Sequence, residues 1–124
     1  MFTDVSDALL ERRARFGGEA ILFACGPLAD RDRRRAMLGA DLRAYPAVLH
    51  DWTRVRGEDG DIFARPSRGD SVSGVAIAVS EEQLETFDRS ARFARFVRAI
   101  AIVDIDGLLT GSFVYTRRGP SEKI

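Results

Sequence analysis

The order of apolar and polar positions in the first third of the chain predicts a helix, a strand and a second helix. Residues 4–16 ("DVSDALLERRARF") carry four apolar side chains within about one face of a helix, and two glycines follow directly. The nearly continuous apolar run at 19–25 ("EAILFAC") is typical of a buried strand. Gly26 and Pro27 break this run. Residues 29–39 then predict a short helix, with an acid near its start and arginines further along.

The middle of the chain predicts extended structure. Residues 40–57 contain a proline among their apolar positions, so we expect extended chain with a bend rather than one long helix. The turn sequences "EDGD" (58–61) and "SRGDS" (67–71) flank a short strand at 62–66. The β-branched and apolar run at 71–80 ("SVSGVAIAVS") predicts a further strand.

The last third predicts a capped helix followed by a hairpin. Residues 80–91 open with a Ser-x-x-Gln pattern, which is a capping box and marks the start of a helix. Residues 95–107 predict a long strand that ends in a turn, and residues 108–118 are expected to pair with it. The tail at 119–124 ("GPSEKI") is expected to be loose. The order of elements indicates a small α+β domain, with a closed or half-closed mixed sheet and a few short helices.

Composition narrows the class of protein. The 124 residues make one domain, and 45% hydrophobic with 31% charged residues indicates a soluble globular fold. The 19 basic and 19 acidic residues cancel, which argues against a general binder of nucleic acid or of anionic membranes. The chain contains no apolar run of the roughly 20 residues that a membrane span needs, and its start does not resemble a signal peptide. We therefore expect a cytoplasmic protein.

The lone cysteine and the lone histidine offer little chemistry. A structural zinc site needs about four Cys or His ligands, so neither metal nor cofactor is expected. Cys25 ends a predicted buried strand, where a nucleophile would need a base nearby, and we interpret it as a small packed hydrophobe. His50 and Asp51 are adjacent on extended chain and point to opposite faces, so they do not form a dyad.

Two charged clusters surround the last predicted helix. The acids Glu81, Glu82 and Glu85 lie in its first turns, where they complement the helix dipole without any function. A set of arginines recurs every third residue from its C-terminal end. We interpret this set as a solvated corner between helix and strand, in which one guanidinium has the chemistry to bind a carboxylate. The set comprises Arg89, Arg92, Arg95 and Arg98.

The strand–turn–helix at 21–30 ("ILFACGPLAD") is the remaining candidate site. Such a turn exposes backbone N–H groups that favour an anion such as a carboxylate, although Pro27 removes one donor.

Several segments together resemble the gamma-glutamylcyclotransferase-like (AIG2-like) family. "ILFACGPL" resembles a first strand that typically ends in Tyr-Gly-Ser/Thr-Leu, and "GADLRAYPAVLHDWTRV" is similar to the segment after the first helix. The piece "VSGVAIAVSEEQLETFD" is the most specific match, and "GSFVYTRR" resembles the closing strand. The resemblance covers about residues 20–118. It implies a small barrel of mixed strands with a pocket at its mouth.

The resemblance also implies an activity, and the motifs that would carry that activity are altered. The family's enzymes cyclise a gamma-glutamyl group to 5-oxoproline, with a glutamate that transfers protons. Counted from Asp88, that glutamate falls on Ala91, which cannot transfer a proton, and the glycine after it is Arg92. In the loop, Cys25 and Pro27 replace the tyrosine and the hydroxyl residue. The matching positions are Gly26, Leu28, Val72, Gly74, Leu84 and Asp88.

Three hypotheses follow from this resemblance. The first, which we favour, is a non-catalytic relative that keeps the fold as a binding or interaction module, with a pocket for a small-molecule ligand that has a carboxylate or with a role in interaction. The second is an active enzyme on a gamma-glutamyl amine or related substrate, with its acid/base moved to Glu85 or Glu82. The third is a subunit or fused-domain remnant that docks on a protein partner, or on a second copy of itself, through residues 4–16. The expected pocket residues are Cys25, Gly26, Pro27, Leu28, Arg92 and Tyr115.

The resemblance also divides the chain into three expected parts. These are an N-terminal helical extension at 1–18, the gamma-glutamylcyclotransferase-like domain at 19–118 and a flexible tail at 119–124.

Overall fold

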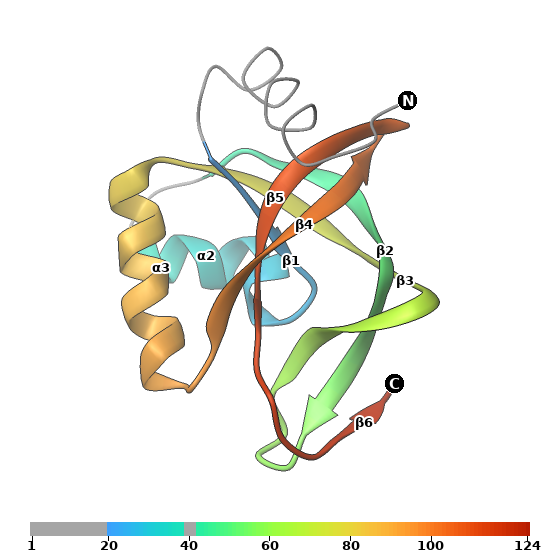
Figure 1. Ribbon diagram of the computed structural model, residues 1–124. Helices are drawn as coiled ribbons and strands as arrows, with labels where there is room; N and C mark the ends of the chain where they lie inside the picture. Colours follow the sequence, from blue (N-terminus) through green and yellow to red (C-terminus); the bar gives the residue numbers. More distant parts are fainter. Residues whose placement is uncertain (1–19, 39–41) are drawn as a thin grey trace.

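Strand β1 (Ala20–Ala24) lies at the centre of the fold, and its two faces are both covered. We describe a computed structural model of residues 20–38 and 42–124 (Figure 1). The predicted helix at 4–16 lies outside the described residues. Ile21 and Phe23 point into a cluster inside the barrel, whereas Leu22 and Ala24 belong to a second cluster on its outside. Burial on both faces explains why this strand reads as a continuous apolar run.

The described residues form a closed barrel of five strands with a sixth strand attached. After β1 come a short 3-10 turn η1 (Pro27–Ala29), helix α2 (Arg31–Leu38), β2 (Ala44–Gly57), β3 (Ile62–Val79), helix α3 (Glu81–Phe93), β4 (Val97–Ile105), β5 (Leu108–Thr116) and β6 (Ser121–Lys123). The sheet order is β3-β1-β5-β4-β2-β6, and pairing of β2 with β3 closes the ring. The β1–β5 pair is parallel and the other pairs are antiparallel. The predicted α+β barrel is confirmed.

Strand β3 differs from the prediction of two strands with a turn between them. It runs without a break for 18 residues. Its register with β2 shifts from His50↔Ser71 to Trp52↔Pro66, so four residues of β3 stand opposite Asp51 alone. The Asp51 carboxylate accepts a hydrogen bond of 2.9 Å from the backbone N–H of Gly69, which has a left-handed φ of 86°. The "SRGDS" turn signal therefore marks a bulge, opposite which Asp51 has a left-handed φ of 65°. Pro46, on which the expected bend rested, lies within β2 and is paired with Val75.

Helix α3 covers the outside of the barrel and begins where the capping box predicts. The Ser80 hydroxyl accepts from the Gln83 backbone N–H at 3.2 Å, and the Gln83 side chain accepts from the Ser80 backbone N–H at 2.9 Å. Leu84 and Phe87 are buried in the outer cluster with residues of β1 and β3. Figure 1 shows α3 and α2 on the same side of the barrel.

The C-terminal tail is ordered by pairing, which corrects the expectation of a loose end. Residues 121–123 form β6, which pairs with Val55–Gly57 of β2. The Arg65 guanidinium donates to the Ser121 hydroxyl at 2.7 Å and to the Gly119 carbonyl at 2.8 Å. Lys123 forms an ion pair with Asp70 at 2.9 Å. The extra length of β2 beyond the barrel gives this tail its hydrogen-bonding edge.

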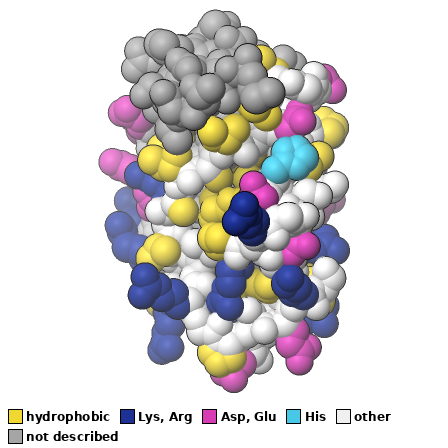
Figure 2. Space-filling model, turned by 45° about the vertical axis from the view of Figure 1, so that its right-hand side comes forward, with side chains coloured by type: hydrophobic (Ala, Val, Ile, Leu, Met, Phe, Trp, Pro, Cys, Tyr) yellow, Lys and Arg dark blue, Asp and Glu magenta, His cyan; other side chains and the backbone are white. Residues whose placement is uncertain are grey.

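Charged and apolar side chains are mixed on one face of the molecule (Figure 2). Basic, acidic and apolar side chains are interspersed on the face that Figure 2 shows, with more basic side chains in its lower half. In the described segments, no helix is both long and apolar enough to cross a membrane.

Candidate functional site

A cavity of about 250 Å³ lies beside the turn that follows β1. Residues Cys25 to Leu28 form one wall, with Phe23 and Ala24 of β1 beside them. The other walls come from the start of β3, the C-terminal part of α3 and the end of β5. These contributions include Asp61, Ile62, Phe63, Ala64, Phe87, Ser90, Ala91, Ala94, Phe96, Val114 and Tyr115, with Met37 of α2.

The turn is held by close backbone packing. A Cβ atom on Gly26 would lie 2.5 Å from the Ile62 carbonyl oxygen, so this position accepts only glycine without a shift of the backbone. The buried Arg34 side chain of α2 donates to the carbonyls of Leu28 at 3.0 Å and of Ala29 at 2.8 Å. Gly74 of β3 lies against the Ala24 carbonyl in the same way. These contacts fix the loop against β3.

Most of the lining is apolar, and much of it is aromatic. Five lining side chains carry aromatic rings: Phe23, Phe63, Phe87, Phe96 and Tyr115. Phe63 and Phe96 meet edge to face with their ring centroids 5.4 Å apart. Neither lysine nor arginine is among the residues that line the cavity within the described segments. The cavity is therefore suited to an apolar body.

The thiol and the phenol that line the cavity are both held in their protonated states. Burial raises the pKa of the Cys25 thiol to about 11, with the Arg54 charge opposing the shift, so the thiol is not a nucleophile at neutral pH. Burial, followed by the hydrogen bond to Asp88, raises the pKa of the Tyr115 phenol. That phenol donates to the Asp88 carboxylate at 2.7 Å, and Arg98 pairs with the same carboxylate at 3.0 Å.

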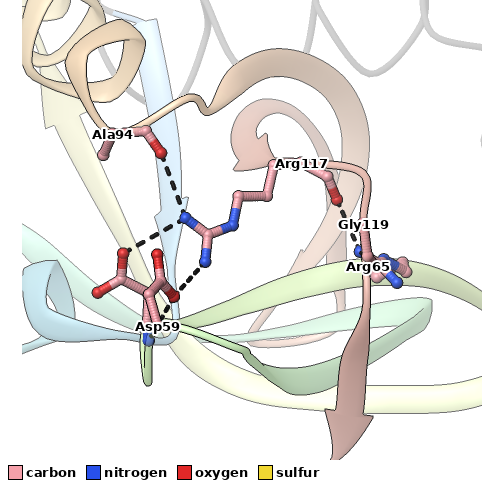
Figure 3. Close-up of polar contacts among 6 residues, drawn as sticks. Asp59, Arg65, Ala94, Arg117 and Gly119 are labelled. Atoms are coloured by element: carbon pink, nitrogen blue, oxygen red, sulfur yellow. Dashed lines mark hydrogen bonds and ion pairs between the residues drawn. The ribbon is translucent and has the colours of Figure 1, made fainter.

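An arginine directly after β5 joins several residues at the edge of the cavity (Figure 3). The Arg117 guanidinium forms ion pairs with Asp59 and, at 3.5 Å, with Asp61, and it donates to the Ala94 carbonyl at 3.2 Å. It also lies over the rings of Phe63 and Phe96, at 5.0 and 4.8 Å from their centroids. Arg117 thus connects the β2–β3 turn to the end of α3.

The ion pair between Arg117 and Asp59 shifts the pKa of both groups. The hydrogen bond from Arg117 lowers the pKa of Asp59 to about 2. The same hydrogen bond raises the pKa of Arg117 further, so the guanidinium stays charged. Sequence reasoning missed this cluster, because "EDGD" predicts only a turn and "GSFVYTRR" predicts only a closing strand.

The structure brings together most of the residues singled out in the sequence. Cys25, Gly26, Pro27, Leu28 and Tyr115 all line the cavity, and so does Ala91, the position at which the resemblance implies a glutamate. Whether these residues bind a ligand stays a prediction.

Other residues singled out in the sequence lie away from the cavity. Arg92 is exposed and is not among the lining residues, and the same holds for Glu82 and Glu85. His50 is half exposed and lies 3.6 Å from Asp104 rather than facing Asp51. Across residues 20–38 and 42–124, no group of three or more His, Cys, Asp and Glu side chains is arranged to hold a metal ion.

Comparisons with known proteins identify the fold. No family model and no curated protein matches the sequence. By structure, the chain is similar to an Arabidopsis thaliana protein known from a solution structure, with 20% identity and a TM-score of 0.72, over 79% of this chain and 68% of that one. It is similar to a gamma-glutamyl cyclotransferase with 17% identity and a TM-score of 0.66, over 85% and 71% of the two chains. It is also similar to an AIG2-like protein from Mus musculus with 21% identity and a TM-score of 0.64, over 82% and 80%.

At these identities the likeness shows the fold. The chain has the gamma-glutamylcyclotransferase-like fold that its sequence resemblance implied, with the cavity beside the turn after β1.

Proposed function

We propose that this domain binds a small molecule with a largely apolar body in the cavity beside Cys25–Leu28, and that it does not catalyse cyclotransfer. The observation that carries the proposal is Ala91. This residue lines the cavity at the position where the resemblance implies a proton-transferring glutamate. Its methyl group adds to the apolar wall and offers no proton.

The remaining ionisable groups of the lining are poorly suited to replace that glutamate. Cyclisation needs a group that takes a proton from the attacking amine and supplies one to the leaving amine. The raised pKa values of Cys25 and Tyr115 keep both groups protonated at neutral pH, so neither acts as a base there. Asp61 is half exposed at the rim and is paired with Arg117.

Two measurements test the proposal. Neither a gamma-glutamyl dipeptide nor a gamma-glutamyl amine should release 5-oxoproline in the presence of the protein.

A neutral apolar probe, phenylbutanol, should shift the NMR resonances of the cavity residues in the ¹⁵N-labelled full chain. Ala91→Phe fills the cavity and should abolish these shifts. Arg89→Phe, on the same helix but exposed and away from the lining, should keep them. Release of 5-oxoproline, or probe shifts that persist in Ala91→Phe, would contradict the proposal.

A second candidate function is an enzyme with a relocated carboxylate. Asp61 favours it, because this carboxylate lines the cavity. Glu85 and Glu82 do not support it, because both are exposed outside the lining. This candidate predicts turnover of a gamma-glutamyl amine by the unmodified chain and its loss in Asp61→Asn. An unmodified chain without turnover argues against it.

A further inference from the structure

The two carboxylates at the rim of the cavity are not equally engaged by their cationic partner. Two carboxylates, Asp59 and Asp61, share one guanidinium, that of Arg117. The Arg117 guanidinium lies closer to the carboxylate of Asp59 than to that of Asp61, from which it is 3.5 Å away. The Asp61 side chain is 49% exposed and is the one of the two carboxylates that lines the cavity. Asp61 therefore offers an only partly neutralised carboxylate to whatever occupies the cavity.

The walls next to this carboxylate suit a cation better than an anion. The face of an aromatic ring attracts positive charge, and this site already shows it. Arg117 lies over Phe63 and Phe96, and Arg65 lies over Phe63 at 5.5 Å from the ring centroid. Phe63 and Phe96 both line the cavity. An anionic group there would face Asp61, and neither lysine nor arginine is among the described lining residues. Arg117, at the edge, already pairs with Asp59 and Asp61 and donates to the Ala94 carbonyl. Arg92, the arginine expected at this pocket, is not among the lining residues.

We infer that the ligand of this cavity is a hydrophobic amine, whose ammonium group binds Asp61 at the rim while its apolar body lies among the aromatic side chains. This inference rests on the proposed binding function and replaces the carboxylate ligand expected from the sequence with a cationic one. The cavity volume of about 250 Å³ is just below the range of roughly 300–1,000 Å³ that is usual for ligand pockets, so the ligand is small.

Three probes that share one body and differ in charge test the inference. Phenylbutylamine, phenylbutanol and phenylbutyrate are titrated into the ¹⁵N-labelled full chain at neutral pH and low salt. We expect the amine to bind about fivefold more tightly than the alcohol, as an exposed ion pair allows, and the acid to bind most weakly. High salt should narrow the difference between amine and alcohol in the unmodified chain, because it screens the charge of Asp61.

Asp61→Asn removes the negative charge at the rim and keeps a side chain of similar size there. In this variant the amine should lose its advantage over the alcohol, whose affinity for the same variant is the reference. Glu58→Gln removes a carboxylate from the same turn but outside the lining, and it should keep the advantage of the amine. The salt series in the unmodified chain gives the same information if Asp61→Asn does not fold.

The outcomes distinguish the inference from the function on which it rests. If the alcohol binds and the amine binds no better, or if Asp61→Asn leaves the advantage of the amine intact, the inference is wrong and the binding function stands. Tightest binding of the acid also overturns the inference. If none of the three probes binds, the proposed function fails and the inference fails with it.

Discussion

Two parts of the cavity wall are built by different forces. The loop, at Cys25–Leu28, is fixed by backbone atoms in close contact, with Gly26 against Ile62 and Gly74 against Ala24. The rim is fixed by charges on long side chains, with Arg117 between two carboxylates and the end of α3. Close packing changes little with salt or pH, whereas exposed ion pairs respond to both. The shape of the cavity and the charge at its rim can therefore be altered separately.

The largest effect is expected from Gly74→Ala, beside the loop. The added Cβ would collide with the Ala24 carbonyl and would lie 2.8 Å from the Phe23 ring. We expect a loss of about 3 kcal/mol in the free energy of unfolding, because neither the backbone nor the buried ring can move away freely. Urea unfolding followed by circular dichroism measures this loss. Ser73→Ala, at the exposed neighbouring position, should change stability little, and an equal loss in both variants would contradict the argument.

Gly26→Ala should have the next largest effect and should act on the cavity as well as on stability. Its Cβ would lie 2.5 Å from the Ile62 carbonyl, so the loop must move away from β3. We expect a cost of about 2 kcal/mol in unfolding free energy and weaker binding of phenylbutanol. Unfolding and NMR titration on the same sample check both effects. A variant with full stability and unchanged binding would show that the loop is not fixed in this way.

Arg117→Met tests the rim and should cost less. Methionine keeps an apolar stem beside Phe63 and Phe96 but removes the guanidinium from their rings and from both carboxylates. We expect a loss of about 1 kcal/mol in unfolding free energy, and this loss should shrink at high salt. Urea unfolding at low and high salt measures it, with Arg118→Met, at the exposed next position, as the control. A loss that does not depend on salt would indicate that packing rather than charge holds the rim.

The smallest effect concerns pH. Because the pKa of Asp59 is lowered from 3.8 to about 2, its stabilising effect is present above pH 4 and is lost as the pH falls toward 2. Asp59→Asn should make the decline of stability over this range shallower than in the unmodified chain. Glu58→Gln should leave the decline as it is. Unfolding midpoints measured between about pH 2 and pH 5 compare the three proteins, and identical slopes in all of them would contradict the role of Asp59.

The elements that could be predicted from the sequence are those whose contacts are local or whose burial is uniform. The apolar run at 19–25 marks β1 because both faces of that strand are covered. The capping box at Ser80 is satisfied by hydrogen bonds within four residues, so the sequence alone contains all its partners. The hairpin of β4 and β5 is likewise local, with a two-residue turn between Ile105 and Leu108.

Features that depend on distant partners could not be predicted. Arg117 binds Asp59, 58 positions earlier in the chain, and no spacing in the sequence marks such a pair. The tail at 119–124 has no strand pattern of its own, and its pairing depends on how far β2 extends beyond the barrel. The loop at 25–28 is recognisable through the family resemblance. Asp61 at the rim cannot be recognised as a site residue from the sequence, because the turn pattern of "EDGD" already accounts for an acidic residue there.

The parallel contact between β1 and β5 has a consequence for the order of assembly. Leu22 of β1 stands opposite Phe113 of β5, so this pair joins segments separated by almost the whole domain. Contacts between such distant segments form slowly, because a long loop must be ordered before they stabilise anything. During synthesis, β1 therefore has to wait for β5 with one edge unpaired, and an unpaired edge is a site of aggregation. The edge of β1 that pairs with β5 is therefore the part of the barrel that is open to wrong pairing until β5 has been synthesised.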